Sequence, residues 1–168
     1  GIADGERATL EDIVYFYALP FHRGEDAVRR HRTYVSCLKA TGVACELARF
    51  KPKYVKCPQC SHTFRRWEEK ETDVAICVKL LEILHMDIPD TVIIVSGDTD
   101  LAPAVRTANR LYPLKRVFFC FPYKRKNQEL QQLAPQSFNL KPKVCINSQL
   151  PGRYPRPDGS YLKRPETW

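Results

Sequence analysis

The chain has 168 residues, 43% of them hydrophobic, which is enough to build a core and predicts one folded domain over residues 1–150. A formal net charge of +8 and a pI near 9.2 favour a polyanionic partner, nucleic acid ahead of an anionic membrane surface. No apolar run spans a membrane, no secretory signal opens the chain, and seven scattered cysteines argue against a disulfide framework. We therefore expect a cytoplasmic protein without a membrane partner.

The first part of the chain alternates between strand and helix patterns. Residues 1–12 are polar and carry no clear element, residues 13–18 predict a strand, and residues 25–41 predict a helix. Residues 43–50 predict a second strand, and residues 51–70 form a basic insertion that contains a Cys-x-x-Cys motif. We expect this insertion to be a loop.

The rest of the chain continues the alternation, which indicates right-handed βαβ units and a mostly parallel sheet in an α/β fold. The long helix predicted at residues 72–86 has a wide apolar stripe. An extended, proline-rich basic tail is predicted for residues 151–168. The elements predicted between them are a strand at 91–95, a helix at 102–111, a strand at 115–121, a short helix at 128–133 and a last strand or extended segment at 137–140.

Two carboxylates follow the predicted strand 91–95. The all-apolar run from Val92 to Val95 predicts a strand buried on both faces, and function collects at the carboxyl ends of such strands. Asp98 and Asp100 would there offer oxygen ligands to a hard cation such as Mg²⁺. The structural alternative is that these residues only cap the helix that follows.

A third carboxylate, Asp73, opens the long helix, where it could equally act as a cap. If both helix starts open onto one rim, Asp73 meets Asp98 and Asp100, and such a cluster is costly unless divalent cations neutralise it. Bound Mg²⁺ or Mn²⁺ would activate a water and stabilise charge on an attacked phosphate, while a basic surface holds the nucleic acid backbone. This combination suits phosphodiester hydrolysis.

Several motifs together resemble the NYN domain, which belongs to the LabA-type branch of the PIN-like nucleases. They are Glu-Lys-Glu-Thr-Asp-Val at residues 69–74, the stretch from Asp90 to Leu101, and Pro-Ala-Val at residues 103–105. The likeness covers most of the chain and implies a three-layer α/β/α fold with metal-dependent RNA hydrolysis. Carried over by motif, the metal-facing carboxylates are Asp73, Asp98 and Asp100, supported by Ser96 and Thr99, with Mg or Mn as the cofactor.

The sequence departs from that family in one respect. Family members open with a strand that ends in an Asp-Gly-x-Asn type motif, and nothing before Ile13 supplies such a strand. Asp4-Gly5 is a superficial echo, too close to Ile13 for the usual intervening helix. The chain is then a fragment, lacks residues that precede this sequence, or is a member that has lost activity. If the strand is truly absent, we expect a gap in the middle of the sheet and one acid fewer in the metal site.

The insertion carries Cys57 and Cys60, whose spacing suits a zinc knuckle. His62, His22 and Cys45 are the candidates for the remaining ligands. Free thiols and a redox couple are the alternatives. A zinc ion would stabilise a basic loop that lies along RNA. A solvated loop without that role is the alternative explanation for its charges. The basic residues of this loop are Lys51, Lys53, Lys56, Arg65 and Arg66.

A second basic segment follows the strand 115–121, where aromatic and basic residues interleave from Phe121 to Lys126. Lys124, Arg125 and Lys126 would contact phosphates while the aromatic rings stack on bases. A strand end followed by a solvated loop is the alternative.

Three functions stay open. The first is a ribonuclease that acts on single-stranded or structured RNA with Mg or Mn. The second is a phosphatase similar to the haloacid dehalogenases, which would need a nucleophilic Asp-x-Asp strand upstream. The third is a non-catalytic RNA-binding or assembly module, which would work as a homo-oligomer or with a protein partner.

Overall fold

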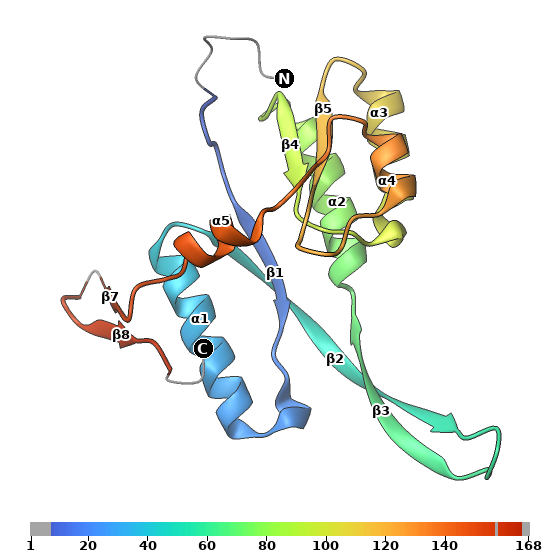
Figure 1. Cartoon of the computed structure of the whole chain (residues 1–168), viewed down its shortest axis with the longest axis vertical. Coiled ribbons are helices and arrows are strands. Elements are labelled where there is room, and N and C mark those ends of the chain that lie inside the picture. The colour runs from blue at the N-terminus through green and yellow to red at the C-terminus, as the bar shows by residue number, and fades with distance from the viewer. Residues whose placement is uncertain (1–7, 157, 166–168) are drawn as a thin grey trace. The chain divides into compact units, whose positions relative to one another are not determined.

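The computed structural model describes residues 8–156 and 158–165 (Figure 1). The chain divides into two compact units: unit 1 contains Asp73–Gln149, and unit 2 contains Asp12–Thr72 and the segment from Leu150 onward. The Asp4-Gly5 dipeptide lies outside the described residues, and residues 8–13 have neither helix nor strand. No helix in the described part of the chain is long and apolar enough to cross a membrane.

Unit 2 is built on β1 (Val14–Ala18), η1 (Phe21–Arg23), α1 (Glu25–Ala40), β2 (Ala44–Lys56) and β3 (Thr63–Lys70). β1 is parallel to the first half of β2, and the second half of β2 is antiparallel to β3. Aromatic side chains join α1 to β1, because the rings of Tyr15 and Tyr34 meet edge to face with centroids 5.7 Å apart. Val28, Val35 and Cys37 form the buried face of α1.

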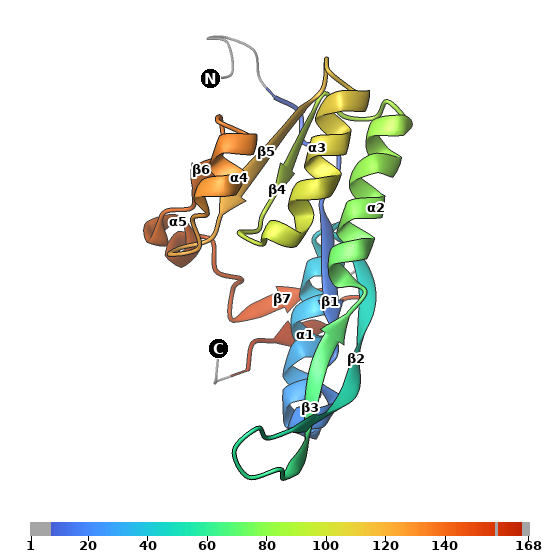
Figure 2. The ribbon, with the colours of Figure 1, turned by 90° about the vertical axis from the view of Figure 1, so that its right-hand side faces the viewer.

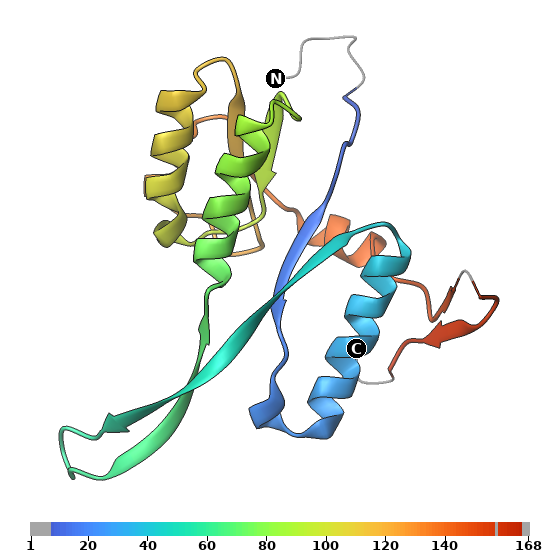
Figure 3. The ribbon, with the colours of Figure 1, turned by 180° about the vertical axis from the view of Figure 1, so that it is seen from behind.

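The insertion at residues 51–70 is a β-hairpin and not the loop that the sequence predicted. β2 continues to Lys56, and β3 returns from Thr63 to Lys70 as a long two-stranded ribbon (Figure 3). The alternation that supports it is visible in the sequence, since Lys51 and Lys53 fall on one face and Pro52 and Tyr54 on the other. Only the turn between Lys56 and Thr63 lies outside the ladder.

The C-terminal segment also differs from the prediction of an extended tail. β7 (Arg153–Pro155) and β8 (Tyr161–Lys163) pair as an antiparallel hairpin. Asp158 stabilises the turn, since its Oδ1 accepts hydrogen bonds from the backbone N–H and the hydroxyl of Ser160. Leu162 is buried, and the hydroxyl of Tyr154 donates to the carbonyl oxygen of Ala40 at the end of α1. The proline-rich composition of this segment therefore did not indicate that it forms a packed β-hairpin.

Unit 1 contains a three-stranded parallel sheet of order β4-β5-β6, formed by β4 (Thr91–Ile94), β5 (Arg116–Phe121) and β6 (Phe138–Asn139). The other elements of this part are α2 (Thr72–His85), η2 (Thr99–Leu101), α3 (Ala102–Leu111), α4 (Gln128–Leu133) and α5 (Pro142–Asn147). Figure 2 shows α2 and α3 side by side along this sheet. The fold of both units is therefore mixed α/β.

Alternate residues of β5 form the centre of the unit 1 core. Val117, Phe119 and Phe121 share one face and pack in a single cluster with Leu84 of α2 and Val105 of α3. Small residues of α3, Ala104 and Ala108, belong to the same cluster and allow a close approach of the helix to the sheet. This packing fixes where β4 and β5 end, and hence where the segments that follow them begin.

The prediction that β4 is buried on both faces is wrong. Ile94 is buried, but Ile93 is 51% exposed and Val95, just beyond the strand, is 64% exposed. The reason is that Ile94 packs with residues of α2, α3 and α4 on one face of the sheet, whereas the side chains of Ile93 and Val95 point to the opposite face.

We predict that Phe119→Ala lowers the free energy of unfolding by about 3–5 kcal/mol, because the side chain is fully buried and its loss leaves a cavity. Urea denaturation followed by circular dichroism measures this loss. The matched control is Phe138→Ala in β6, which is 45% exposed and should cost about 1 kcal/mol or less. Equal losses in the two variants would contradict the assignment of the core.

Candidate functional site

Residues Ser96–Asp100, here named the acid turn, follow the carboxyl end of β4. The N–H of Asp98 donates to Ser96 Oγ at 3.1 Å, and Asp98 Oδ1 accepts from the N–H of Asp100 at 3.1 Å. Asp98 is therefore the N-cap of η2, which begins at Thr99. Asp98 therefore caps a helix, as the structural alternative predicted. The carboxylates of Asp98 and Asp100 are nevertheless exposed, and Asp98 Oδ2 takes no part in the cap. The turn is thus fixed with its acids toward solvent.

Residues 122–126, here named the basic loop, follow the carboxyl end of β5, the strand next to β4. The N–H of Arg125 donates to the carbonyl oxygen of Pro122 at 2.9 Å, which closes a turn. Lys124 adopts a φ of 60°, and its ammonium lies over the ring of Tyr123, 5.3 Å from the centroid. The loop therefore holds an aromatic ring and three cations in one tight segment.

The acid turn and the basic loop touch through their backbones. A Cβ placed on Gly97 would lie 2.2 Å from the carbonyl oxygen of Arg125, so only glycine allows this approach. The contact follows from the parallel pairing of β4 and β5, in which Ile94 lies opposite Phe119. Sequence analysis did not single out Gly97, although a glycine between a strand end and two acids was the available signal.

The third acid, Asp73, lies in the first turn of α2 and is exposed. One turn later, burial raises the pKa of the Cys77 thiol, and the nearby carboxylates of Asp73 and Asp100 raise it further. Asp73 and Asp100 thus act on the same sulfur from α2 and from the acid turn. Among the described residues, no three His, Cys, Asp or Glu side chains lie close enough together to hold a metal ion.

Cys57 and Cys60 lie in the turn at the tip of the β2–β3 hairpin. The N–H of Cys57 donates to the carbonyl oxygen of His62 at 2.8 Å, and the N–H of Ser61 donates to the carbonyl oxygen of Cys57 at 2.9 Å. Hydrogen bonds from the backbone N–H groups of Cys60 and Gln59, and from the Cys60 thiol, lower the pKa of the Cys57 thiol. The two sulfurs therefore face each other.

Two of the expected zinc ligands lie elsewhere in unit 2, which corrects the prediction. The ring of His22 stacks on Trp67 at 5.4 Å and meets Phe50 edge to face at 4.6 Å. At a rise of about 3.3 Å per residue, Phe50 is roughly 23 Å along the strand from Cys57. Cys45 lies further still, where β2 pairs with Tyr15 of β1. Neither side chain can complete a site at the tip, because tertiary packing fixes both at the base of the ribbon.

The basic residues of the hairpin divide between its two faces. Lys51 and Lys53 share one face with Arg66, since Lys53 lies opposite Arg66 in the ladder, and Lys53 Nζ lies 3.0 Å from Glu68 Oε1. On the other face, the Arg65 guanidinium lies 5.2 Å from the centroid of the Trp67 ring. Lys56 is the last residue of β2, next to the tip. Both faces therefore carry positive charge, with Lys53 partly neutralised.

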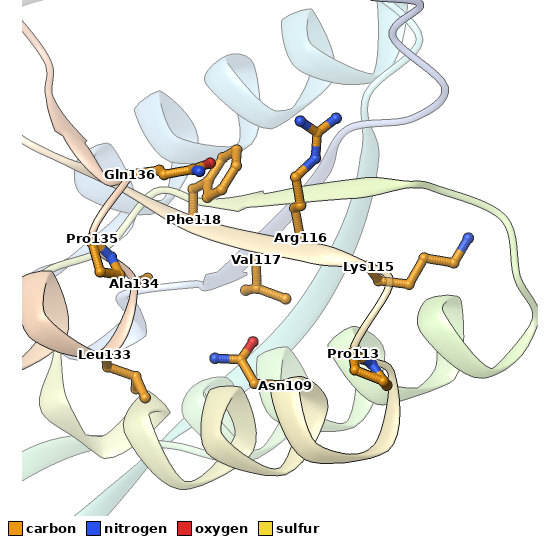
Figure 4. Close-up of a pocket in the computed structure, with 10 residues that line it drawn as sticks. All are labelled: Asn109, Pro113, Lys115, Arg116, Val117, Phe118, Leu133, Ala134, Pro135 and Gln136. Atoms are coloured by element: carbon orange, nitrogen blue, oxygen red, sulfur yellow. The ribbon is translucent and has the colours of Figure 1, made fainter. Parts of the chain in front are cut away.

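A cavity of about 310 Å³ lies at the opposite end of β5 from the basic loop (Figure 4). Lys115 and Arg116 contribute its cationic groups, but Lys115 Nζ is paired with Asp87 at 2.6 Å and Asp90 at 3.2 Å. None of the residues predicted for the site lines this cavity. We therefore place the candidate site at the acid turn and the basic loop.

Comparison with known proteins gives one family and one solved structure. The family model of the NYN domain matches residues 6–141, which confirms the resemblance seen in the sequence. A protein of unknown function from Vibrio parahaemolyticus has a similar crystal structure, with a TM-score of 0.54 and 21% identity over 78% of this chain and 69% of that chain. At this identity the likeness shows the fold alone. No curated protein matches the chain.

We predict that Gly97→Ala destabilises unit 1 by about 1–3 kcal/mol, because the new methyl group forces the acid turn away from the Arg125 carbonyl. Thermal or urea denaturation measures the loss, and amide NMR shifts at residues 122–126 report the displacement. Gly152→Ala is the matched control, since a Cβ there meets nothing within 4 Å. The contact would be refuted by two variants with equal stability and unchanged shifts at residues 122–126.

Proposed function

The chain belongs to the NYN domain family, and on this premise we propose that it is a metal-dependent ribonuclease that hydrolyses RNA phosphodiesters. NYN domains have PIN-like α/β folds and are generally RNA-binding nuclease domains, so family membership indicates a nuclease or RNA-related function. The observation that carries the proposal is the contact of Gly97 with Arg125, which sets exposed carboxylates beside a cationic loop. The three-layer arrangement with a mostly parallel central sheet and a cytoplasmic location are parts of the same proposal.

Three carboxylates are the proposed metal ligands: Asp73, Asp98 and Asp100, with the hydroxyls of Ser96 and Thr99 in support. Their oxygens suit a hard cation such as Mg²⁺ or Mn²⁺. The shared effect of Asp73 and Asp100 on Cys77 supports their nearness, and the cap leaves Asp98 Oδ2 for coordination. The ion, when bound, supplies an activated water and positive charge at the attacked phosphate.

Basic and aromatic residues would bind the RNA. Lys124, Arg125 and Lys126 would bind backbone phosphates next to the acid turn, and the Tyr123 ring would stack on a base. In the hairpin, Lys53, Lys56, Arg65 and Arg66 offer a second track for the backbone. The Asp98 cap holds the backbone of the acid turn, since Asp98 Oδ1 accepts a hydrogen bond from the N–H of Asp100.

A second candidate is a catalytically degenerate RNA-binding or assembly module of the same fold. It is favoured by the finding that no three potential metal ligands gather among the described residues. The phosphatase hypothesis finds less support, because β1, the first described strand, reads Val-Tyr-Phe-Tyr-Ala and offers no Asp-x-Asp nucleophile. Metal-dependent cleavage of RNA separates the first two candidates.

We predict that Asp98→Asn and Asp100→Asn each lower Mn²⁺-dependent cleavage of RNA by at least about 100-fold, since each removes a charge that the reaction centre requires. Asparagine can still cap η2 at position 98, so the fold should persist. Cleavage of a labelled single-stranded and a labelled hairpin RNA measures the effect. Glu82→Gln on the exposed face of α2 is the control and should retain full activity. Unchanged cleavage in both aspartate variants would exclude the acid turn as the reaction centre.

We predict that Arg125→Gln combined with Lys126→Gln weakens RNA binding and lowers the slope of log K against log salt by about 1.4, at roughly 0.7 per phosphate contact for a single strand. Fluorescence anisotropy with an RNA oligonucleotide between about 50 and 200 mM salt measures it. Arg110→Gln with Arg116→Gln removes equal charge at the opposite end of β5. An equal fall in slope for both pairs would show that net charge alone, and not the basic loop, binds RNA.

A further inference from the structure

The tip of the hairpin holds two thiols in one fixed turn. Two backbone hydrogen bonds close the turn around Cys57, and Ser61 within it adopts a φ of 59°. Both cysteines belong to the short connection between the end of β2 at Lys56 and the start of β3 at Thr63. A turn that aims two cysteine sulfurs at one point is half of a tetrahedral zinc site.

The other half is not found within the described part of the chain. No third His, Cys, Asp or Glu joins the two cysteines there, and His22 and Cys45 are held at the base of the ribbon. The two cysteines nevertheless stay accessible, because Cys60 is exposed and Cys57 is half-buried. All seven cysteines are free thiols. A structural zinc ion needs four protein ligands, so this pair satisfies only two of them.

We propose that two copies of this chain share one zinc ion at their hairpin tips, with Cys57 and Cys60 of each copy as its four ligands. A twofold axis through the ion would bring the same turn from both copies to the same point, as in an isologous dimer. The proposal is independent of the ribonuclease activity, because neither cysteine lies at the acid turn. It assigns a function to the one motif that the proposed reaction does not use.

Charge explains why this dimer would depend on the metal. Residues 51–66 contain five basic side chains and no acidic one, so two approaching tips repel each other. Four thiolates around Zn²⁺ carry a net charge of about −2, which the adjacent Lys56 and Arg65 of both copies can offset. Without the ion, the repulsion between the basic side chains of the two tips is uncompensated. The shared zinc ion would therefore be what holds the two hairpin tips together.

The test uses the full chain, purified with a phosphine reductant and without chelator. We expect one zinc per two chains by mass spectrometry of the metal, and a dimer by light scattering after size exclusion. A chelator should convert the dimer to a monomer, and added Zn²⁺ should restore it. Co²⁺ in place of zinc should give the visible absorption of a tetrahedral four-thiolate site.

Variants separate the site from general effects of cysteine loss. Cys57→Ser and Cys60→Ser should each give a zinc-free monomer with an unchanged circular dichroism spectrum. Cys60→His keeps a zinc ligand and should restore a zinc-dependent dimer. Cys145→Ser in α5 is the control and should keep one zinc per two chains. The proposal is overturned by a monomer with one zinc per chain, by a zinc-free wild-type protein, or by a dimer that survives both chelator and Cys57→Ser.

Discussion

The account depends on one close contact, between the backbone of Gly97 and the carbonyl of Arg125. Two adjacent parallel strands, β4 and β5, end at the same edge of their sheet, and each is followed by a segment of opposite charge. A side chain at position 97 would separate these segments. Because glycine stands there, a turn with exposed carboxylates and a basic loop share one edge of unit 1. Val117, Phe119 and Phe121 of β5 are buried in the core of unit 1 and hold the strand that leads to this edge in place.

Periodicity and helix signals allowed the local elements to be predicted well. The helices at 102–111 and 128–133 have the predicted bounds, because an amphipathic pattern and a helix start with Pro103 or Asn127 are local features. The predicted acid turn also follows its strand. The exposure of Ile93 and Val95 could not be predicted, because it depends on whether another layer of the structure covers that face of β4. Two of the candidate zinc ligands, His22 and Cys45, were wrong for a similar reason: His22, for example, packs on Trp67, a partner that no sequence spacing reveals.

The two basic regions differ in what surrounds them. The backbone of the basic loop adjoins the acid turn, which carries exposed acids. On the hairpin, Lys53 is paired with Glu68 and Arg65 lies over Trp67, so this ribbon offers a mixture of charge and aromatic surface. Such a surface suits a sequence-tolerant grip on single-stranded RNA.

The most direct test of the central claim is paramagnetic line broadening by Mn²⁺ in the amide NMR spectrum of the whole chain. If Asp73, Asp98 and Asp100 hold one ion beside the basic loop, substoichiometric Mn²⁺ should broaden the amides of residues 73, 97–100 and 122–126 first. The amides at the start of β5, around Arg116, should stay sharp. Broadening that is uniform along the chain, or that reaches Asp98 and Asp100 without Asp73, would contradict the shared site.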